Sequence, residues 1–440
     1  MATAVKTHTV LWLTVLSVLA APAIVHSSRL MVILLDGFRW DYFNIHGMGL
    51  KGFPKLFQIG TKVEYTVLDF PTLSYPNYYT IMTGLYDDIH GMVANYMYDE
   101  VREEEFLIGT NPEYNQSFWW DGGDPLWITA TRQKKSAHMY YWPNCEVLIR
   151  GLTPASCVPY IGIPSRRNFI KATSEGMALL HKKRADVVGI YYELTDATGH
   201  RYGPRSAELK QVIRDLDEDI YGLLADWERR NLRDKVDIII MSDHGMTDVS
   251  PERVVRIENY VNASDVQRFL EYGAFMSIWP KDGKLDEVYN SLVNASKHMS
   301  VYKREETPEH WHYRKHYRIS PIVVSMETGW IVLKPNQTYK YYNESQPLSG
   351  THGYDNTYTD MRGIFVAAGP NFKASFVSKP IHAVDMYQVM CKSLGIQPSA
   401  HNGSWSRVKE MWVGSAATHL ELNHYLIFVW AVVVYIYLYM

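Results

Sequence analysis

Short apolar segments alternate with longer amphipathic segments along most of the chain. Four of the short segments are almost entirely hydrophobic, namely 30–35 (LMVILL), 186–192 (DVVGIYY), 236–241 (VDIIIM) and 363–368 (GIFVAA). Apolar runs of this length are typical of strands that are buried on both faces of a parallel sheet. Between the second and third runs, residues 206–230 repeat leucine, valine and isoleucine at helical spacing, as the crossover helix of an α/β unit does.

Two further regions complete the predicted architecture. Residues 385–396 repeat apolar side chains at helical spacing. Residues 250–345 are polar and contain segments rich in tyrosine, histidine, lysine and arginine, such as EHWHYRKHYRIS. We therefore predict an α/β fold in which helices flank a mostly parallel sheet, with a smaller subdomain inserted at 250–345.

Both ends of the chain carry apolar segments of a different kind. Residues 1–27 combine an early lysine, an apolar stretch and small residues, which predicts a secretory signal peptide. Residues 425–440 are uncharged and mostly apolar, and their length is marginal for a membrane span. With the small residues and polar spacer before them, they predict a GPI-attachment signal at 414–440, with Ser415 as the attachment site. We expect residues 28–413 to lie on the extracellular face of the plasma membrane, held by this anchor.

Composition narrows the range of partners. The net charge of −3 offers no basic surface of the kind that nucleic-acid-binding proteins carry, so we predict no nucleic-acid partner. Six Asn-x-Ser/Thr sequons predict a glycosylated exterior. Their asparagines are Asn115, Asn262, Asn294, Asn336, Asn343 and Asn402.

The chain has only three cysteines. Cys145 and Cys157 lie close enough in sequence to close a short loop, and such a disulfide contributes about 3 kcal/mol in the chain-entropy model. Cys391 falls in a helical apolar pattern, which predicts a buried free thiol. The odd count leaves intermolecular pairing, and with it a homodimer, open.

Carboxylate and imidazole side chains gather at the ends of the predicted strands. They are Asp36 after the first strand, Asp196 and His200 after the second, Asp243 and His244 after the third, and His352 shortly before the fourth. Each alone is explained as a turn, cap or loop residue. Ligand sites of open α/β sheets lie beyond the carboxyl ends of the strands, so we expect these six groups to converge. Aspartate and histidine together suit zinc, and six ligands can hold two ions.

A single serine stands in PTLSYPNYYTIMTG, residues 71–84. Pro76 suits the first turn of a helix and Gly84 suits its end, so Ser74 lies at or next to a helix N-terminus. A serine there usually caps the helix. Beside two ions about 4 Å apart, the same hydroxyl would lose its proton and become a nucleophile for displacement at phosphorus.

Six motifs in order, DGFR, PTLSYPN, NYMYD, DATGH, SDHGM and HGYDN, resemble the ectonucleotide pyrophosphatase/phosphodiesterase family of the alkaline phosphatase superfamily. The resemblance implies an alkaline-phosphatase-like fold, with residues 28–413 as the phosphodiesterase domain, and two Zn²⁺ ions. It assigns one ion to Asp196, His200 and His352, and the other to Asp36, Asp243 and His244 with the Ser74 oxygen. It also implies that Asn95 hydrogen-bonds a phosphate oxygen and that Asp36, Asp196, His244 and His352 contact the substrate. Most relatives carry threonine where this chain has Ser74.

The resemblance also implies a mechanism. Ser74 attacks phosphorus in line, a phosphoryl-serine intermediate forms, and water hydrolyses it with net retention at phosphorus. Sulfatases of the superfamily need an arginine where this chain has Tyr78, so they are set aside.

The family resemblance leaves open which phosphodiester is the substrate. The larger relatives carry cysteine-rich modules and a nuclease-like domain, for which this chain lacks the cysteines. The stretch YYWPNCEV, the nucleophilic serine and the apolar tail most resemble the sixth branch of the family, the glycerophosphocholine cholinephosphodiesterases. That resemblance implies phosphocholine release from glycerophosphocholine, lysophosphatidylcholine or sphingosylphosphocholine.

A quaternary ammonium group needs aromatic faces and a nearby carboxylate. Tyr160 and Tyr191 are the candidates, with Glu193 as the acid, although strand alternation turns only one of Tyr191 and Tyr192 toward the site. Two alternatives remain: a nucleotide phosphodiesterase, and a catalytically inactive, anchored recognition protein. Loss of a ligand would favour the second alternative, and all six ligands are present.

Overall fold

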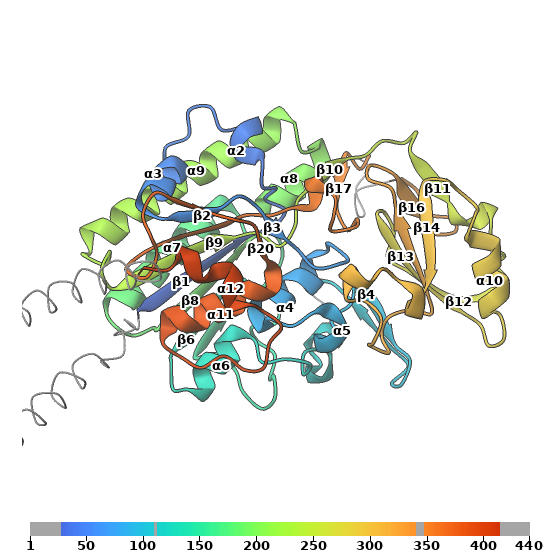
Figure 1. Ribbon diagram of the computed structural model, residues 1–440, viewed down its shortest axis with the longest axis horizontal. Coiled ribbons are helices and arrows are strands. Elements are labelled where there is room, and N and C mark those ends of the chain that lie inside the picture. Colours follow the sequence, from blue (N-terminus) through green and yellow to red (C-terminus); the bar gives the residue numbers. More distant parts are fainter. Residues whose placement is uncertain (1–27, 110–111, 340–346, 414–440) are drawn as a thin grey trace, which may run out of the picture.

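A mixed eight-stranded sheet forms the centre of the computed structural model, which describes residues 28–109, 112–339 and 347–413 (Figure 1). The strands follow one another across the sheet in the order β19 (Phe376–Ser378), β2 (Thr61–Val63), β18 (Phe365–Ala368), β9 (Val236–Met241), β1 (Arg29–Leu35), β8 (Val187–Tyr192), β6 (Ala137–Tyr140) and β7 (Ser156–Val158). The central strand β1 pairs in parallel with β8 and β9. The predicted α/β fold is confirmed.

One strand runs in the direction opposite to that expected. The segment predicted at 363–368 forms β18, which is antiparallel to β9, with Phe365 opposite Met241, and antiparallel to β2. The expectation of a parallel strand here was wrong. An apolar run predicts that a strand is buried on both faces, and burial is the same for either chain direction.

Helices cover both faces of this sheet (Figure 1). Successive side chains of β1 point to opposite faces, so Leu30 and Val32 belong to one apolar cluster and Met31 and Ile33 to the other. The second cluster is covered by α3 (Gly52–Ile59), α7 (Arg166–His181) and α9 (Ala207–Arg229), and the first by α4 (Ser74–Thr83), α6 (Leu126–Arg132) and α11 (Ala383–Leu394). The helices predicted at 206–230 and 385–396 are α9 and α11.

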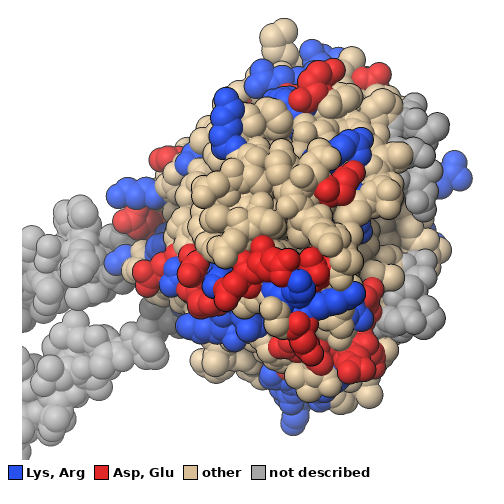
Figure 2. Space-filling view, turned by 90° about the vertical axis from the view of Figure 1, so that its right-hand side faces the viewer, with Lys and Arg blue, Asp and Glu red and all other residues tan. Residues whose placement is uncertain are grey.

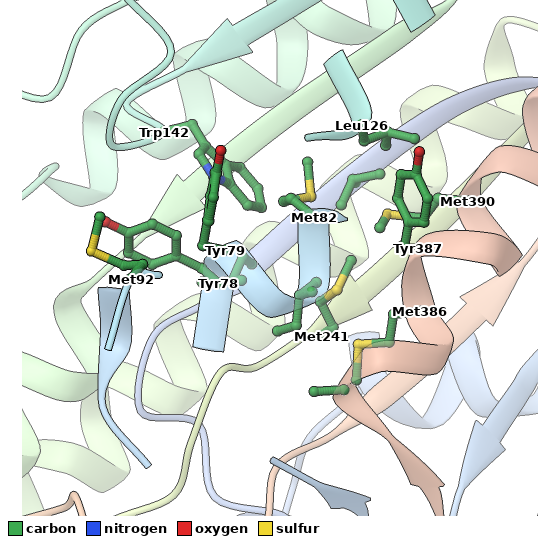
Figure 3. Packing of buried hydrophobic residues seen from close by; sticks show 14 of the residues in the cluster. Tyr78, Tyr79, Met82, Met92, Leu126, Trp142, Met241, Met386, Tyr387 and Met390 are labelled. Atoms are coloured by element: carbon green, nitrogen blue, oxygen red, sulfur yellow. The ribbon is translucent and has the colours of Figure 1, made fainter. Parts of the chain in front are cut away.

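Methionine and aromatic side chains fill the space between α4 and α11 (Figure 3). Met82 of α4 belongs to the same apolar cluster as Met386 and Met390 of α11, and all three are fully or almost fully buried. Gly84 ends α4 in the left-handed conformation, with φ of 70°, as its sequence position predicted. This packing fixes the helix whose first residue is Ser74.

A second, four-stranded sheet lies beside the main one (Figure 1). Its order is β12 (Val266–Leu270), β13 (Phe275–Pro280), β15 (Ile322–Met326) and β14 (Met299–Lys303), and α10 (Leu285–Leu292) packs on it. The remaining helices are α2 (Tyr42–Ile45), α5 (Asp87–His90), α8 (Leu194–Tyr202) and α12 (Trp405–Val408). The remaining strands are β3 (Thr66–Val67), β4 (Tyr96–Asp99), β5 (Glu104–Leu107), β10 (Thr247–Asp248), β11 (Val254–Arg256), β16 (Ile331–Leu333), β17 (Gly350–Thr351) and β20 (Ile381–His382).

Acidic and basic side chains lie side by side on the face formed by this smaller sheet (Figure 2). Lys284 pairs with Asp265 at 3.2 Å, and Lys303 pairs with Asp286 at 2.7 Å. This face therefore offers mixed charge, with blue and red atoms adjacent, where a nucleic-acid site would need a continuous basic patch.

The predictions about the cysteines and the glycosylation sequons can be compared with the structure wherever it describes the residues concerned. Cys145 and Cys157 form a disulfide, with Cα atoms 5.7 Å apart, and Cys391 is a buried free thiol whose pKa burial raises to about 12. The five sequon asparagines that the structure describes are all exposed: Asn115, Asn262, Asn294, Asn336 and Asn402.

Several predictions fall on residues that the structure does not describe. They are the signal peptide at 1–27, the sequon at Asn343, and the attachment signal at 414–440 with Ser415. Within the described ranges, no helix has both the length and the apolar character needed to cross a membrane.

A buried arginine ties the β4–β5 hairpin to the rest of the molecule. Arg318 donates from Nε to the Asp99 carboxylate at 3.0 Å and from Nη1 to the Gly91 carbonyl at 3.1 Å. Replacing it, as in Arg318→Met, leaves a fully buried carboxylate without its main partner, so we expect a loss of about 3–5 kcal/mol in the free energy of unfolding. Urea titration measures this loss. Arg102→Met removes an exposed partner of the same carboxylate and should cost less than about 1 kcal/mol; equal losses would contradict the assignment.

Candidate active site

The predicted site residues come from β1, β9, β17, α4 and α8, which are labelled in Figure 1. Asp36 directly follows β1, and Asp243 and His244 follow β9 after one intervening residue, Ser242. The others are Asp196 and His200 on α8, His352 after β17, and Ser74 as the first residue of α4. The carboxyl ends of neighbouring parallel strands meet at one sheet edge, and this brings groups from distant parts of the chain together. The six acid and imidazole groups form two buried clusters, each with its ligand atoms within 4.8 Å of one another.

The first cluster contains Asp196, His200 and His352. The Asp196 Oδ1 atom lies 3.4 Å from His200 Nε2 and 3.5 Å from His352 Nε2, and the two Nε2 atoms are 3.1 Å apart. One helical turn separates Asp196 from His200 on α8, so both side chains project from the same helix face. His352 reaches the cluster from a loop more than 150 residues further on.

The second cluster contains Asp36, Asp243 and His244. His244 Nε2 lies 3.1 Å from Asp36 Oδ1 and 3.6 Å from Asp243 Oδ2. The hydroxyl of Ser74 lies 3.1 Å from the same nitrogen. The rings of His244 and His352 are stacked with centroids 3.5 Å apart, so the two clusters are adjacent.

The hydrogen bonds of the imidazoles prepare them for a metal. The Nδ1 atoms of His200, His352 and His244 lie 2.8–2.9 Å from the carbonyl oxygens of Gly350, Thr72 and Gly245 respectively. A ring that donates through Nδ1–H to a carbonyl presents Nε2 as the metal-binding atom. In each of the two clusters, Nε2 is the atom that faces the carboxylates.

The carboxylates give an independent test of this fit. Three of their oxygens are buried without a hydrogen-bond partner: Asp36 Oδ1, Asp196 Oδ1 and Asp243 Oδ2. A buried carboxylate oxygen without a donor is costly unless a cation compensates it. The oxygens and the Nε2 atoms point at one another within each cluster, so the residues fit a divalent cation in both.

Burial dominates the electrostatics of the site. It raises the pKa values of Asp196 and Asp243 well above the ordinary value and lowers the pKa of His200 to about 4. Burial would also lower the pKa of His244, but the charges of Asp243 and Asp36 outweigh it and raise that pKa to about 10. A cation held by these residues would offset the cost of keeping the acids charged.

One backbone position, Gly37, decides how closely the clusters approach. Gly37 has φ of 67°, and a Cβ atom on it would lie 2.8 Å from the Asp196 Cα atom. Its N–H donates to Asp243 Oδ1 at 3.2 Å. Gly37 therefore joins the two clusters in a way that a residue with a side chain could not. The DGFR motif contained this glycine, but its role depends on a contact across the fold.

The structure also shows the position of Ser74 relative to the N-terminus of its helix. Leu73 is the N-cap residue of α4, and no side chain caps the helix. The Ser74 hydroxyl therefore does not cap the helix and faces His244 instead. Asn95 is next to this point: its Oδ1 accepts from the N–H of Tyr75 at 3.0 Å, and it lines the same cavity as His200 and His352.

Tyr160 and Tyr191 lie against the second cluster. The Tyr191 hydroxyl donates to the Asp36 carboxylate, and the Tyr160 hydroxyl donates to Glu193 at 2.6 Å. The two rings meet edge to face with centroids 6.0 Å apart. Burial and the nearby Asp36 charge raise the pKa of Glu193 to about 8. Tyr192 points to the opposite face of the sheet, where it packs on the α7 side.

Comparison with known proteins identifies the family. The family model described as type I phosphodiesterase / nucleotide pyrophosphatase matches residues 30–355. Human ectonucleotide pyrophosphatase/phosphodiesterase family member 5 is 34% identical over 384 residues, which are 87% of this chain and 78% of that protein. The bis(5'-adenosyl)-triphosphatase enpp4 of Xenopus laevis is 33% identical over 387 residues, 87% of this chain and 81% of that protein. This chain belongs to the ectonucleotide pyrophosphatase/phosphodiesterase family.

A solved structure of a relative agrees in fold. Murine family member 5, an inactive variant in complex with AMP, superposes with a TM-score of 0.80 at 33% identity and covers 88% of this chain and 100% of its own. The chain is thus a hydrolase of phosphodiester bonds with an alkaline-phosphatase-like fold. These similarities support the family as a whole and give no specific support to the glycerophosphocholine cholinephosphodiesterase branch.

Proposed function

We propose that this chain is a zinc-dependent choline phosphodiesterase that releases phosphocholine from glycerophosphocholine and, with it, from lysophosphatidylcholine and sphingosylphosphocholine. The observation that carries the proposal is the group formed by Tyr160, Tyr191 and Glu193 beside the second acid–imidazole cluster. Two aromatic rings and a partly buried carboxyl group suit a quaternary ammonium group, which can donate no ordinary hydrogen bond.

The residues of this chain divide the chemistry between them. Ser74 Oγ forms a bond to phosphorus while the bond to the leaving alcohol oxygen breaks on the opposite side. The N-terminus of α4 favours the anionic phosphate, and Asn95 donates an amide hydrogen to one of its oxygens. Water then cleaves the phosphoryl-serine, and the two displacements together retain configuration. Two zinc ions, when bound, would lower the pKa of the Ser74 hydroxyl and offset charge on the leaving oxygen.

A nucleotide phosphodiesterase is the second candidate. It is favoured by the AMP held in the structure of murine family member 5 and by the triphosphatase activity in the name of the Xenopus relative. In this case the Tyr160 and Tyr191 rings would stack on a base, and the carboxyl of Glu193 would have no cation to face.

We propose further that the protein works outside the cell, on the plasma membrane. The apolar segments at 1–27 and 425–440 are the basis for this, as signal peptide and GPI-attachment signal. Release of the protein from intact cells by a phosphatidylinositol-specific phospholipase C would support the anchor, and retention of the protein on the cells would refute it.

The substrate proposal is tested with the full chain expressed in a secretory host with zinc. Glycerophosphocholine and a nitrophenyl nucleotide diester are supplied in parallel, and phosphocholine, free choline and nitrophenol are followed separately. Phosphocholine release supports the proposal. Cleavage of the nucleotide diester alone would favour the second candidate, and no turnover of either with metal bound would favour an inactive recognition protein.

The role of Tyr160 in choline binding is tested by a substitution. Tyr160→Ala should raise KM for glycerophosphocholine about 10- to 30-fold and change kcat little, because a desolvated cation–π contact contributes about 2 kcal/mol to binding. Steady-state kinetics measures both constants. Tyr221→Ala, which truncates an exposed tyrosine on α9, is the matched control and should leave KM within about twofold. An unchanged KM for Tyr160→Ala would remove this ring from the choline site.

A further inference from the structure

The cavity lined by Asn95, His200 and His352 adjoins the site on the side of the first cluster. Its volume is about 60 Å³, and it includes the two imidazoles of that cluster, His200 and His352. Its lining also includes Asn95, Tyr96 and Glu271. A water needs about 10–15 Å³ in such a cavity, so the space holds on the order of four waters. This volume suits a three-carbon polyol.

Glu271 is the acidic residue of this cavity, and its placement is unusual. It follows β12 with φ of 61°, a conformation that few residues other than glycine adopt. Its side chain is buried, with 4% exposed, and Oε1 accepts from the N–H of Tyr96 at 2.7 Å. Burial raises the pKa of this carboxyl to about 8. A strained backbone that directs a buried acid into a cavity beside a catalytic cluster points to a functional role.

The two ends of the site therefore differ in chemistry. Tyr160 and Glu193 lie toward Asp36, in the second cluster, whereas Glu271 lies in the cavity of His200 and His352. If choline occupies the end with Tyr160 and Glu193, the alcohol that leaves from phosphorus must occupy the cavity with Glu271. The chemistry of the Glu271 cavity thus bears on the leaving group and not on the choline.

We propose that Glu271 is a specificity-determining residue that hydrogen-bonds the free hydroxyls of the leaving glycerol. This inference rests on the proposed function and deepens it. A glycerophosphodiester presents two vicinal hydroxyls, and a carboxyl group has two oxygens that can meet them. One oxygen of Glu271 already holds the Tyr96 N–H, and the same contact orders the chain beside Asn95. Glu271 thus favours a polyol leaving group over an aliphatic one of the same length.

The experiment compares two substrates that differ only in those hydroxyls, glycerophosphocholine and propylphosphocholine. The ratio of their kcat/KM values is measured for the wild-type chain, for Glu271→Gln and for Glu271→Leu. Gln can still accept from the Tyr96 N–H but places an amide where the second oxygen was. Glu105→Gln, a partly exposed glutamate on β5 that pairs with Arg268, is the matched control.

We expect the wild-type chain to prefer glycerophosphocholine by at least about tenfold, since a leaving group without hydroxyls leaves the buried carboxyl of Glu271 short of a hydrogen-bond partner. Both Glu271 variants should bring the ratio to within about threefold of one, and Glu105→Gln should leave it unchanged. A general loss of structure lowers both rates and not their ratio, so the test holds even where a variant is less stable.

Two results would overturn the inference, and they are distinguishable. A ratio that is unchanged in both Glu271 variants refutes the role of Glu271 and leaves the choline phosphodiesterase standing. Failure of the wild-type chain to release phosphocholine from either substrate refutes the proposed function and this inference with it.

Discussion

Ser74→Ala is expected to lower kcat/KM for any phosphodiester substrate by at least about 10³-fold. Removal of a nucleophile leaves only binding and electrostatic catalysis, and losses of this size or larger follow in other hydrolases. The expectation rests on the position of the hydroxyl, 3.1 Å from His244 Nε2 and at the N-terminus of α4. Initial rates with glycerophosphocholine and with a nitrophenyl nucleotide diester measure it independently of which substrate is preferred.

Two controls make this result specific. Ser74→Thr keeps the hydroxyl and should retain activity within about tenfold, since threonine supplies the same nucleophilic group. Ser74→Ala should also change the free energy of unfolding by less than about 1 kcal/mol, because Leu73 and not Ser74 is the N-cap residue. An active Ser74→Ala variant that remains folded would show that another group attacks phosphorus.

Local patterns were enough to predict the parts of the fold that the site depends on. The apolar runs at 30–35 and 236–241 predicted β1 and β9, and the helix predicted at 206–230 is α9. Asp36 follows the first run directly, and Asp243 follows the second after Ser242. Their convergence followed from one general property of parallel strands, so the two clusters could be predicted before any distance was known.

What the sequence could not predict depends on contacts between distant residues. The direction of β18 is one example, because its apolar pattern is the same in either direction. Glu271 is another: it reaches the N–H of Tyr96 across 175 positions of the chain, and nothing in the local sequence LEYG indicates a buried acid. Such a partner is determined by how the smaller sheet lies against the β4 strand, which is a tertiary property.

Removal of metal is expected to abolish activity completely and reversibly. The two clusters contain buried carboxylate oxygens without hydrogen-bond partners and imidazoles that are oriented through Nδ1. We expect two zinc ions per chain by elemental analysis, loss of turnover after dialysis against a chelator, and recovery on addition of zinc. An ion present at 1,000 times its Kd stabilises the fold by about 4 kcal/mol, so chelation should also lower Tm.

Single substitutions distinguish the contributions of the two clusters to metal binding. His352→Ala should reduce the content from two ions to one, whereas Ser74→Ala should keep both ions and lose only turnover. His138→Ala alters a half-buried histidine of β6 that lies outside both clusters, and it should keep both ions and full activity.

The most informative measurement is the number of ions bound by the His352→Ala variant. One remaining ion means that the clusters bind independently, as their separate ligand sets indicate, whereas loss of both ions means that the stacked rings of His244 and His352 make them one cooperative site. Two remaining ions would contradict the assignment of His352 as a ligand.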